Sequence, residues 1–424
     1  MRAFVTDGDQ RPALAVTRSL GRRGITVVVG EEAGRSLASS SAYCRGHVTY
    51  PSPRRHPRAF EQFLLELVQQ QQFDVIVPVT DVTTHAIASL QDVLRRHCAI
   101  AVPPLDAFNR VTDKSTLLGL AAQCGIRTPR TDRVDGLIGL KTVAADLVYP
   151  VVIKPVRSRI PTEAGWIAAT VHYAQSPDQL WRLYRSIGYL TEHPSLIQQR
   201  IVGPGHGVFV IFDRGRLLTA FAHRRVREKP PSGGASVLCE SIRVDEALQE
   251  AAARLLGAIG WHGVAMLEFK QDAATGDHYL MEVNGRFWGS LQLAIDAGVD
   301  FPHLTYQLAT GELPDVPQSY RLGVKSRWLL GDLDSLLLRM RNSDADLNLP
   351  DGAPSKMRAL FEFMRFMEPG LRYDVFSARD PRPFLHEMNQ YIRELSLIAN
   401  RRMLRRFSRI SFGKRGFIRP SIQK

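Results

Sequence analysis

The chain has 424 residues, of which 44% are hydrophobic and 23% charged. This composition excludes a disordered, collagen-like or disulfide-scaffold protein, and the length favours two or three domains. The formal net charge is +13, but nine Lys or Arg and no acidic residue lie in 401–424, so the rest of the chain carries only +4.

Residues 1 to about 105 alternate short apolar segments with helical patterns, which predicts a parallel sheet covered by helices. The first turn, Asp7-Gly8-Asp9-Gln10, lacks the G-x-G-x-x-G glycines that let a backbone approach a pyrophosphate, which argues against a classical nicotinamide site. Strands are expected at 2–6, 25–30, 74–79 and 99–103, and helices at 11–23, 57–71, 82–96 and 106–124.

The pattern changes at Gly125 to strands with one helix near 177–189, and 203–311 forms a second strand-rich unit. After about residue 320 the chain is expected to be helical and rich in turns. The four cysteines are too far apart for a CxxC zinc or redox pair. No apolar run approaches the roughly 20 residues of a membrane-spanning helix, and the start lacks the apolar region of a signal peptide. These features predict a protein of the reducing cytoplasm.

A lysine, Lys154, ends the apolar segment 149–154, and the following proline keeps it extended. A cation at the end of a buried strand is costly unless it meets an anion. Lys154 is therefore either a ligand-binding residue or a side chain that reaches solvent. The next segment, 156–166, is rich in Arg, Ser, Pro and Gly and is either a mobile flap over phosphates or a plain surface loop.

Basic residues alternate along a predicted strand at 221–227, which places His223, Arg225 and Arg227 on one face. The glycines of the following segment, 229–236, permit close backbone approach to a ligand. This face is either a basic ligand-binding surface or a solvated strand face.

The sharpest pattern predicts a β-hairpin that brings two glutamates together. Its turn lies at Thr275-Gly276, and a centre at Thr275 places Glu268 opposite Glu282. On this register Leu267, Phe269, Met281 and Val283 face the core, whereas Asn284 and Arg286 follow Glu282 on the polar face.

Two carboxylates directly opposed on neighbouring strands repel, so the pair predicts a bound cation. Oxygen ligands from Glu268, Glu282 and Asn284 suit Mg²⁺ or Mn²⁺, which commonly bridge carboxylates and nucleotide phosphates. Solvated glutamates on an exposed face are the alternative.

With these motifs the chain resembles the ATP-grasp superfamily, and most closely its predicted carboxylate-amine ligases, also known as ATP-dependent carboligases. The motifs extend over about residues 70–320, in the family's order. The resemblance implies an α/β and α+β architecture. A pre-grasp Rossmann-like parallel-sheet domain (1–110) is followed by the N-terminal (111–200) and C-terminal (201–320) lobes of an ATP-grasp fold and by a helical C-terminal extension (321–424).

The resemblance also implies site residues. Asp113-Lys114 looks like the lysine motif that opens the ATP site, Val152-Ile-Lys154-Pro like the second phosphate-binding lysine, and Gln198-Gln199-Arg200-Ile201 like the hinge whose backbone reads adenine. The segments around Glu268 and Glu282 look like the two metal-ligand motifs. The implied set is Lys114, Lys154, Gln198, Gln199, Arg200 and Ile201 for ATP, Glu268, Glu282 and Asn284 for the metal, and Arg286, Arg225 and Arg227 for catalysis.

Two positions depart from the family pattern. Gln199-Arg200 stands where many relatives have Glu-Tyr, so the usual acidic contact in the hinge is missing. Gly285 replaces the usual proline after the asparagine of the metal motif.

The implied reaction joins a small-molecule carboxylate to an amine through an acyl phosphate, with ATP and Mg²⁺ (or Mn²⁺), and releases ADP and phosphate. An ATP-grasp carboxylase or phosphotransferase is the near alternative. A non-catalytic nucleotide-binding protein is the alternative from a different class. No nucleic-acid partner is expected.

The tail has Met403, Leu404, Phe407 and Ile410 at helical spacing between arginines, which predicts a basic amphipathic helix. Such a helix lies either on an anionic membrane, as a peripheral contact, or on the protein's own body. The expected localisation is cytoplasmic, with or without membrane association. A homodimer is compatible with the sequence, which does not determine the oligomeric state.

Overall fold

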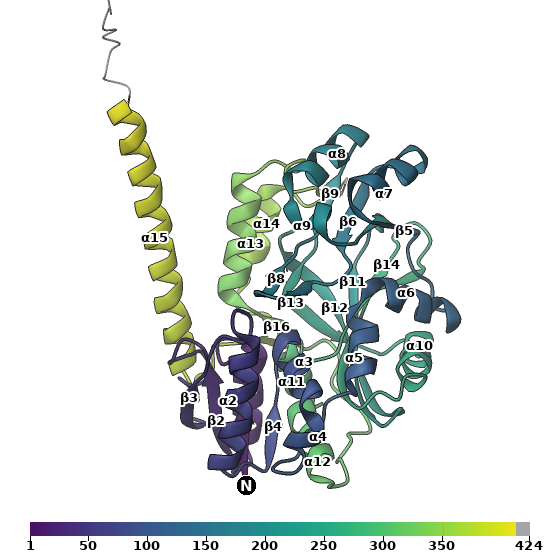
Figure 1. The fold of residues 1–424 in the computed structure, drawn as a ribbon. Coiled ribbons are helices and arrows are strands. Elements are labelled where there is room, and N and C mark those ends of the chain that lie inside the picture. Colours follow the sequence, from purple (N-terminus) through teal and green to yellow (C-terminus); the bar gives the residue numbers. More distant parts are fainter. Residues whose placement is uncertain (351, 413–424) are drawn as a thin grey trace, which may run out of the picture.

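The computed structural model describes the backbone of residues 1–350 and 352–412, with side chains up to Leu397. Three larger sheets and one two-stranded hairpin organise the chain (Figure 1). None of the helices in this described part is long and apolar enough to cross a membrane. The predicted tail contact depends on side chains between 401 and 410, which lie outside the described residues.

The first unit is the predicted parallel sheet, in the order β3-β2-β1-β4. Apolar side chains cover both of its faces, as expected for strands that lie between helices. The expected strand at 99–103 is wrong, because this segment makes only one bridge, between Ala99 and Val75. The strand β3 was not predicted, because its residues alternate between half-buried and exposed at the sheet edge. The elements are β1 (Arg2–Val5), α1 (Arg11–Arg22), β2 (Thr26–Glu31), β3 (Cys44–Thr49), α2 (Pro57–Gln70), β4 (Val75–Val77), α3 (Asp81–Ser89) and α4 (Gln91–Leu94).

The helix expected at 106–124 is two helices, α5 (Leu105–Thr112) and α6 (Lys114–Gln123). Asp113 has an extended backbone conformation between them, and its side chain accepts a hydrogen bond from the backbone N–H of Thr116. A side-chain cap of this kind starts a helix. The break places Lys114 in the first turn of α6, where it is buried.

The N-terminal lobe has an antiparallel sheet in the order β5-β10-β6-β9. Its helices cover one face, where apolar side chains of β6 and β10 pack. The elements of this lobe are β5 (Thr131–Val134), α7 (Gly136–Val143), the 3₁₀ helix η1 (Ala144–Asp146), β6 (Val151–Pro155), the hairpin β7 (Arg159–Thr162) and β8 (Gly165–Ala168), β9 (His172–Ala174), α8 (Pro177–Ser186), α9 (Gly188–Glu192) and β10 (Ser195–Gln199).

The C-terminal lobe has a seven-stranded sheet in the order β15-β14-β11-β12-β13-β16-β17. One face packs on the first unit together with α11 and α12, and the other packs on α5, α6 and α10. Its elements are β11 (Gly205–Asp213), β12 (Arg216–Lys229), β13 (Ala235–Ile242), α10 (Glu246–Gly257), β14 (Gly263–Gln271), β15 (His278–Asn284), α11 (Leu291–Ala297) and α12 (Phe301–Thr310).

The segment after residue 320 is less helical than predicted. It adds β16 (Lys325–Arg327) and β17 (Leu371–Tyr373) to the edge of the C-terminal sheet, which therefore extends past the predicted boundary. The helices α13 (Leu329–Arg341), α14 (Lys356–Phe363) and α15 (Arg382–Phe412) account for the rest of its regular structure in the described part of the chain. In Figure 1, α15 rises from beside the first unit as a single long helix.

Candidate active site

The β14–β15 hairpin has the predicted pairing of Glu268 with Glu282. Beyond this pair a bulge shifts the register by one residue, so Phe269 lies opposite Leu280. Leu280 is therefore buried and Met281 only half-buried, which corrects the expectation that Met281 faces the core. Met266 and Glu268 lie on the same face of β14. Met266 packs in the core, whereas Glu268, two residues further along, belongs to the site.

Two buried lysines lie beside Glu282. The Nζ of Lys114 is 3.6 Å from Oε2 of Glu282, and Lys154 interacts electrostatically with the same carboxylate. Burial would raise the pKa of Glu282, but the two lysines and a hydrogen bond from Asn284 lower it to about 2. Burial lowers the pKa of Lys154 to about 8, against the attraction of Glu282 and with the repulsion of Lys114. The structure thus brings both predicted phosphate-binding lysines to the predicted metal site.

The second glutamate is held by an arginine. Both ends of the Arg225 guanidinium contact Glu268, with Nη1 2.9 Å from Oε1, and Nη1 also donates to Glu228 at 2.9 Å. Burial and the charge of Glu282 raise the pKa of Glu268, and the guanidinium of Arg225 opposes that rise. The paired carboxylates of Glu268 and Glu282 thus have different affinities for a proton.

The predicted placement on one face is confirmed for His223 and Arg225, which both line the cavity described below, and is wrong for Arg227. A bulge at Val226 pairs Arg225 with Cys239 but Arg227 with Leu238, so the two arginines point to opposite sides. The guanidinium of Arg227 is held by the buried carboxylate of Asp332 at 2.6 and 2.8 Å. Arg227 does not line the cavity described below.

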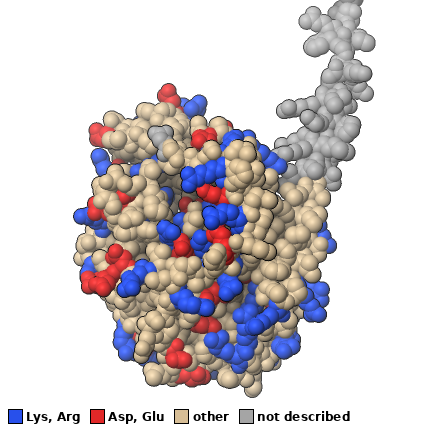
Figure 2. Space-filling model, turned by 180° about the vertical axis from the view of Figure 1, so that it is seen from behind, with Lys and Arg blue, Asp and Glu red and all other residues tan. Residues whose placement is uncertain are grey.

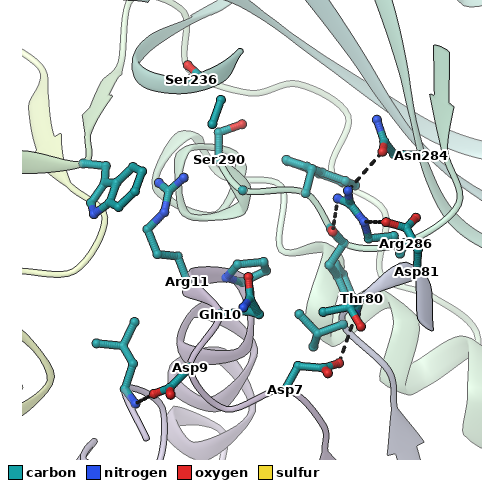
Figure 3. Close-up of a pocket in the computed structure, with 18 of the residues that line it drawn as sticks. Asp7, Asp9, Gln10, Arg11, Thr80, Asp81, Ser236, Asn284, Arg286 and Ser290 are labelled. Atoms are coloured by element: carbon teal, nitrogen blue, oxygen red, sulfur yellow. Dashed lines mark hydrogen bonds and ion pairs between the residues drawn. The ribbon is translucent and has the colours of Figure 1, made fainter. Parts of the chain in front are cut away.

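A chain of hydrogen bonds connects the hairpin to the first unit (Figure 3). The Asn284 amide donates to Glu282 at 3.1 Å and accepts from Nη2 of Arg286 at 3.0 Å. The Nε of Arg286 lies 3.2 Å from Asp81, at the start of α3. The structure therefore fixes Arg286 on the polar face predicted for it, and Asp81 is a partner that the sequence motifs did not reveal.

The predicted hinge lies on the N-terminal lobe. Gln198 pairs with Val152 and Leu196 with Lys154, so the Gln198 side chain shares one face of the sheet with Lys154. The Gln198 amide donates to Thr131 at 2.9 Å, and its oxygen is buried without a partner among the described atoms.

The next two hinge residues point elsewhere. Gln199 accepts a long hydrogen bond from the backbone of Arg130 at 3.4 Å, and Arg200 donates to the carbonyl of Asn348. Gln198, Gln199 and Arg200 line a second cavity, of about 970 Å³, which Asn348 and its neighbours also line, whereas Ile201 is buried. The segment after residue 320 thus reaches the hinge.

A cavity of about 770 Å³ lies between the first unit, the C-terminal lobe and α15. Glu268, Glu282 and Arg286 line it together with carboxylates of the first unit. Seen from behind (Figure 2), Lys and Arg lie beside Asp and Glu around a hollow near the middle of the face. A chamber with both charges suits a small polar ligand better than an extended polyanion.

The segment 156–166, expected to be either a flap or a surface loop, forms the β7–β8 hairpin, called the flap below, and contacts the first unit. The backbone N–H of Trp166 donates to the carbonyl of Arg54 at 2.9 Å, and the Trp166 ring lies 5.3 Å from His85. A Cβ at Gly165, whose φ is +123°, would come within 2.2 Å of the Arg54 carbonyl oxygen. Only glycine permits this contact between the flap and the first unit.

The donor set fits a hard divalent cation. Two carboxylates and the Asn284 amide lie together on the hairpin, and carboxylate and amide oxygens are the ligands that Mg²⁺ or Mn²⁺ prefers; here the Asn284 nitrogen faces Glu282 and its oxygen accepts from Arg286. Within the described residues no group of three or more His, Cys, Asp or Glu could hold a metal ion. Phosphate oxygens and water would have to complete the coordination.

The arrangement of lobes and site residues has counterparts among known proteins. Two lobes enclose buried lysines that face a pair of glutamates, and residues 191–330 match the family model described as ATP-grasp in the biosynthetic pathway with Ter operon. The chain therefore has the ATP-grasp fold, and its match to this family model extends over residues 191–330.

Solved structures have the same fold. The biotin carboxylase of Campylobacter jejuni is 17% identical, with a TM-score of 0.60 over 76% of this chain and 74% of that chain. The L-amino acid ligase of Bacillus licheniformis is 18% identical, with a TM-score of 0.58 over 74% of each chain. The N5-carboxyaminoimidazole synthetase of Staphylococcus aureus is 16% identical, with a TM-score of 0.57 over 76% and 80% of the two chains.

Proposed function

We propose that the protein is an ATP-dependent ligase that joins a small-molecule carboxylate to an amine through an acyl phosphate. The observation that carries the proposal is the convergence of Lys114 and Lys154 on Glu282, opposite Glu268, at the edge of the chamber. Two buried cations next to two carboxylates are an arrangement suited to phosphate groups and a divalent cation. The adjoining chamber offers space for the two substrates.

The residues suggest a division of labour along the cleft. Lys114 and Lys154 would hold the ATP phosphates, and the backbone beside Gln198 would receive the adenine. Glu268, Glu282 and Asn284 would hold Mg²⁺ or Mn²⁺, which neutralises phosphate charge when bound. These groups position the reactants and offset charge, which is how phosphoryl transfer is mainly catalysed.

Arg286 would stabilise the transferring phosphate, because it lines the chamber beside Asn284. An oxygen of the substrate carboxylate attacks the γ-phosphorus, and ADP leaves. The amine nitrogen then attacks the carbonyl carbon of the acyl phosphate, phosphate leaves and the nitrogen loses a proton. No protein nucleophile is needed.

A screen for ADP release tests the proposal. The protein is mixed with ATP, Mg²⁺ and pairs of carboxylic acids and amines, and the product is identified by mass spectrometry. ADP release that needs both partners, with an amide product, supports a ligase. Release with bicarbonate and one acceptor would point to a carboxylase, release with a phosphorylated product to a phosphotransferase, and tight ATP binding without turnover to a non-catalytic role. Glu282→Gln serves as the inactive control.

A further inference from the structure

The two-stranded flap directs successive side chains to different places. Arg157 lies 3.5 Å from Asp113, and the hydroxyl of Ser158 accepts a hydrogen bond from Lys114 at 2.9 Å. Ser158 therefore faces the lysines of the nucleotide cleft. The next residue, Arg159, instead lines the chamber between the first unit and the C-terminal lobe.

Arg159 enters a part of the chamber that already holds two arginines. Arg54 comes from the first unit and Arg286 from the end of β15, and all three line the chamber. Burial, the charge of Arg54 and the charge of Arg286 lower the pKa of Arg159, whereas Asp81 opposes the change. Three guanidinium groups thus share one region, although like charges repel.

The carboxylates nearby pair with the other two arginines, and the second oxygen of Glu32 has no hydrogen-bond partner among the described atoms. Asp81 accepts from Arg286 at 3.2 Å, and Glu32 lies 4.0 Å from Arg54. In the part of the chain that the structure describes, Arg159 itself makes no ion pair and no side-chain hydrogen bond. A half-buried arginine without a counter-charge is costly, and an anionic ligand would supply that charge.

The position of Arg159 is set by the docked flap. The contact of Trp166 with the carbonyl of Arg54 ties β8 to the first unit, and Gly165 makes that approach sterically feasible. Arg159 lies on the paired strand, opposite Ala168. The arginine is thus held in the chamber by the same contacts that close the flap.

We propose that Arg159, with Arg54, binds a second anionic group of the acid substrate, so that this substrate is a dicarboxylic or phosphorylated acid rather than a simple monocarboxylic acid. This inference rests on the proposed ligase function, in which the reacting carboxylate lies near Arg286. The second anion is assigned to the acid and not to ATP, because Ser158 faces Lys114 while Arg159 faces the chamber.

The test measures binding and does not need turnover. Wild-type protein is saturated with Mg²⁺ and a non-hydrolysable ATP analogue, and butyrate, succinate, glutarate and 3-phosphopropionate are titrated by calorimetry. We expect at least one dianionic acid to bind about tenfold or more tightly than butyrate. The Arg159→Gln variant should lose this preference, since one lost charged contact costs about tenfold in affinity. Its affinity for the ATP analogue should stay within about twofold of wild type.

Two further variants make the test specific. Arg157→Gln, which changes a flap arginine that faces Asp113, should keep the preference. Arg159→Lys keeps the charge without the planar fork and should keep part of it. Equal binding of butyrate and the dianions by wild type, or an unchanged preference in Arg159→Gln, overturns the inference.

Two results separate this inference from the ligase proposal. If Arg159→Gln weakens the ATP analogue and the acid equally, Arg159 belongs to the phosphate site and the inference is wrong. If butyrate supports amide formation as well as the dianions do, the inference fails while the ligase function stands. Preferential binding of dianions that is lost in Arg159→Gln, without any ADP release, would support an anion site at Arg159 but contradict the ligase proposal and with it the assignment of the anion to a substrate.

Discussion

Arg225 and Glu268 form a two-pronged ion pair at the position where a metal ligand is expected, with Nη1 2.9 Å from Oε1 and Nη2 in contact with Oε2. The guanidinium binds the Glu268 carboxylate where a metal ion would bind, and its positive charge relieves the repulsion between Glu268 and Glu282. Arg225 and a divalent cation are therefore competitors for Glu268.

Removing this competitor should strengthen metal binding. We expect Arg225→Gln to bind Mn²⁺ alone about tenfold more tightly than wild type, because an ion pair no longer has to be broken. Electron paramagnetic resonance of free Mn²⁺ measures the affinity. The matched control is Arg224→Gln, which changes an exposed arginine paired with Glu240 and should bind Mn²⁺ as wild type does. Unchanged or weaker binding by Arg225→Gln would show that the two do not compete.

Replacing Glu282 should affect both turnover and stability. Glu282→Gln should lower ADP release by orders of magnitude, because it removes a proposed metal ligand. Glu282 also balances the charges of two buried lysines, so its replacement should destabilise the fold. We therefore expect a loss of about 1–3 kcal/mol at pH 7.

The stability loss should depend on pH in a defined direction. Folding lowers the pKa of Glu282 from 4.5 to about 2, so its contribution is complete above pH 4.5 and is lost as the pH falls toward 2. Urea unfolding at pH 7 and pH 4 should show a smaller difference between wild type and Glu282→Gln at the lower pH. A difference that grows on acidification contradicts this assignment of charge.

Lys154 should take up a proton when the nucleotide binds. Burial lowers its pKa to about 8, so about half of the lysines are neutral at pH 8, and the approach of phosphates raises the pKa again. Calorimetry of ATP binding in two buffers of different ionisation enthalpy should detect uptake at pH 8. Lys154→Met should abolish the uptake and weaken ATP binding about 10- to 100-fold. Lys154→Arg, which stays charged, should bind ATP without uptake.

The ion pair of Arg227 with Asp332 should matter for stability and not for the nucleotide. Asp332 is almost fully buried and accepts from Arg227 and from Arg327 at 2.7 Å. Asp332→Asn should lower the free energy of unfolding by about 3–5 kcal/mol, because two guanidinium groups lose their counter-charge. Arg227→Gln should be less destabilising and should keep the ATP affinity of wild type. A large loss of ATP affinity in Arg227→Gln would restore this residue to the site.

Strand periodicity predicted a hairpin over Glu268 and Glu282. Its turn is centred between Ala274 and Thr275 and not on Thr275, and the two glutamates face each other as predicted because the bulge at Met281 adds one residue. The bulges at Met281 and Val226 could not be predicted, since one extra residue leaves the hydrophobic pattern almost unchanged yet reverses the side of each following residue. That is why Arg225 was placed well and Arg227 was not.

Contacts between residues far apart in the sequence could not be predicted either. Asp81 holds Arg286, and Arg54 meets the flap, although about 200 and 110 residues respectively separate the contacting groups in the sequence. No local pattern marks such contacts, because they depend on how whole units pack. The same holds for β16 and β17, which are too short to have a recognisable periodicity.

The chamber closes with residues that the ribosome adds late. His386 of α15 lies 3.9 Å from Asp9, and on the same helix Tyr391 donates to Asp334 at 2.6 Å. A nascent chain that has completed β15 already has its lysines and glutamates, yet it lacks this wall. The order of synthesis thus delays completion of the chamber until α15 has emerged, and a C-terminal truncation before α15 would remove this wall.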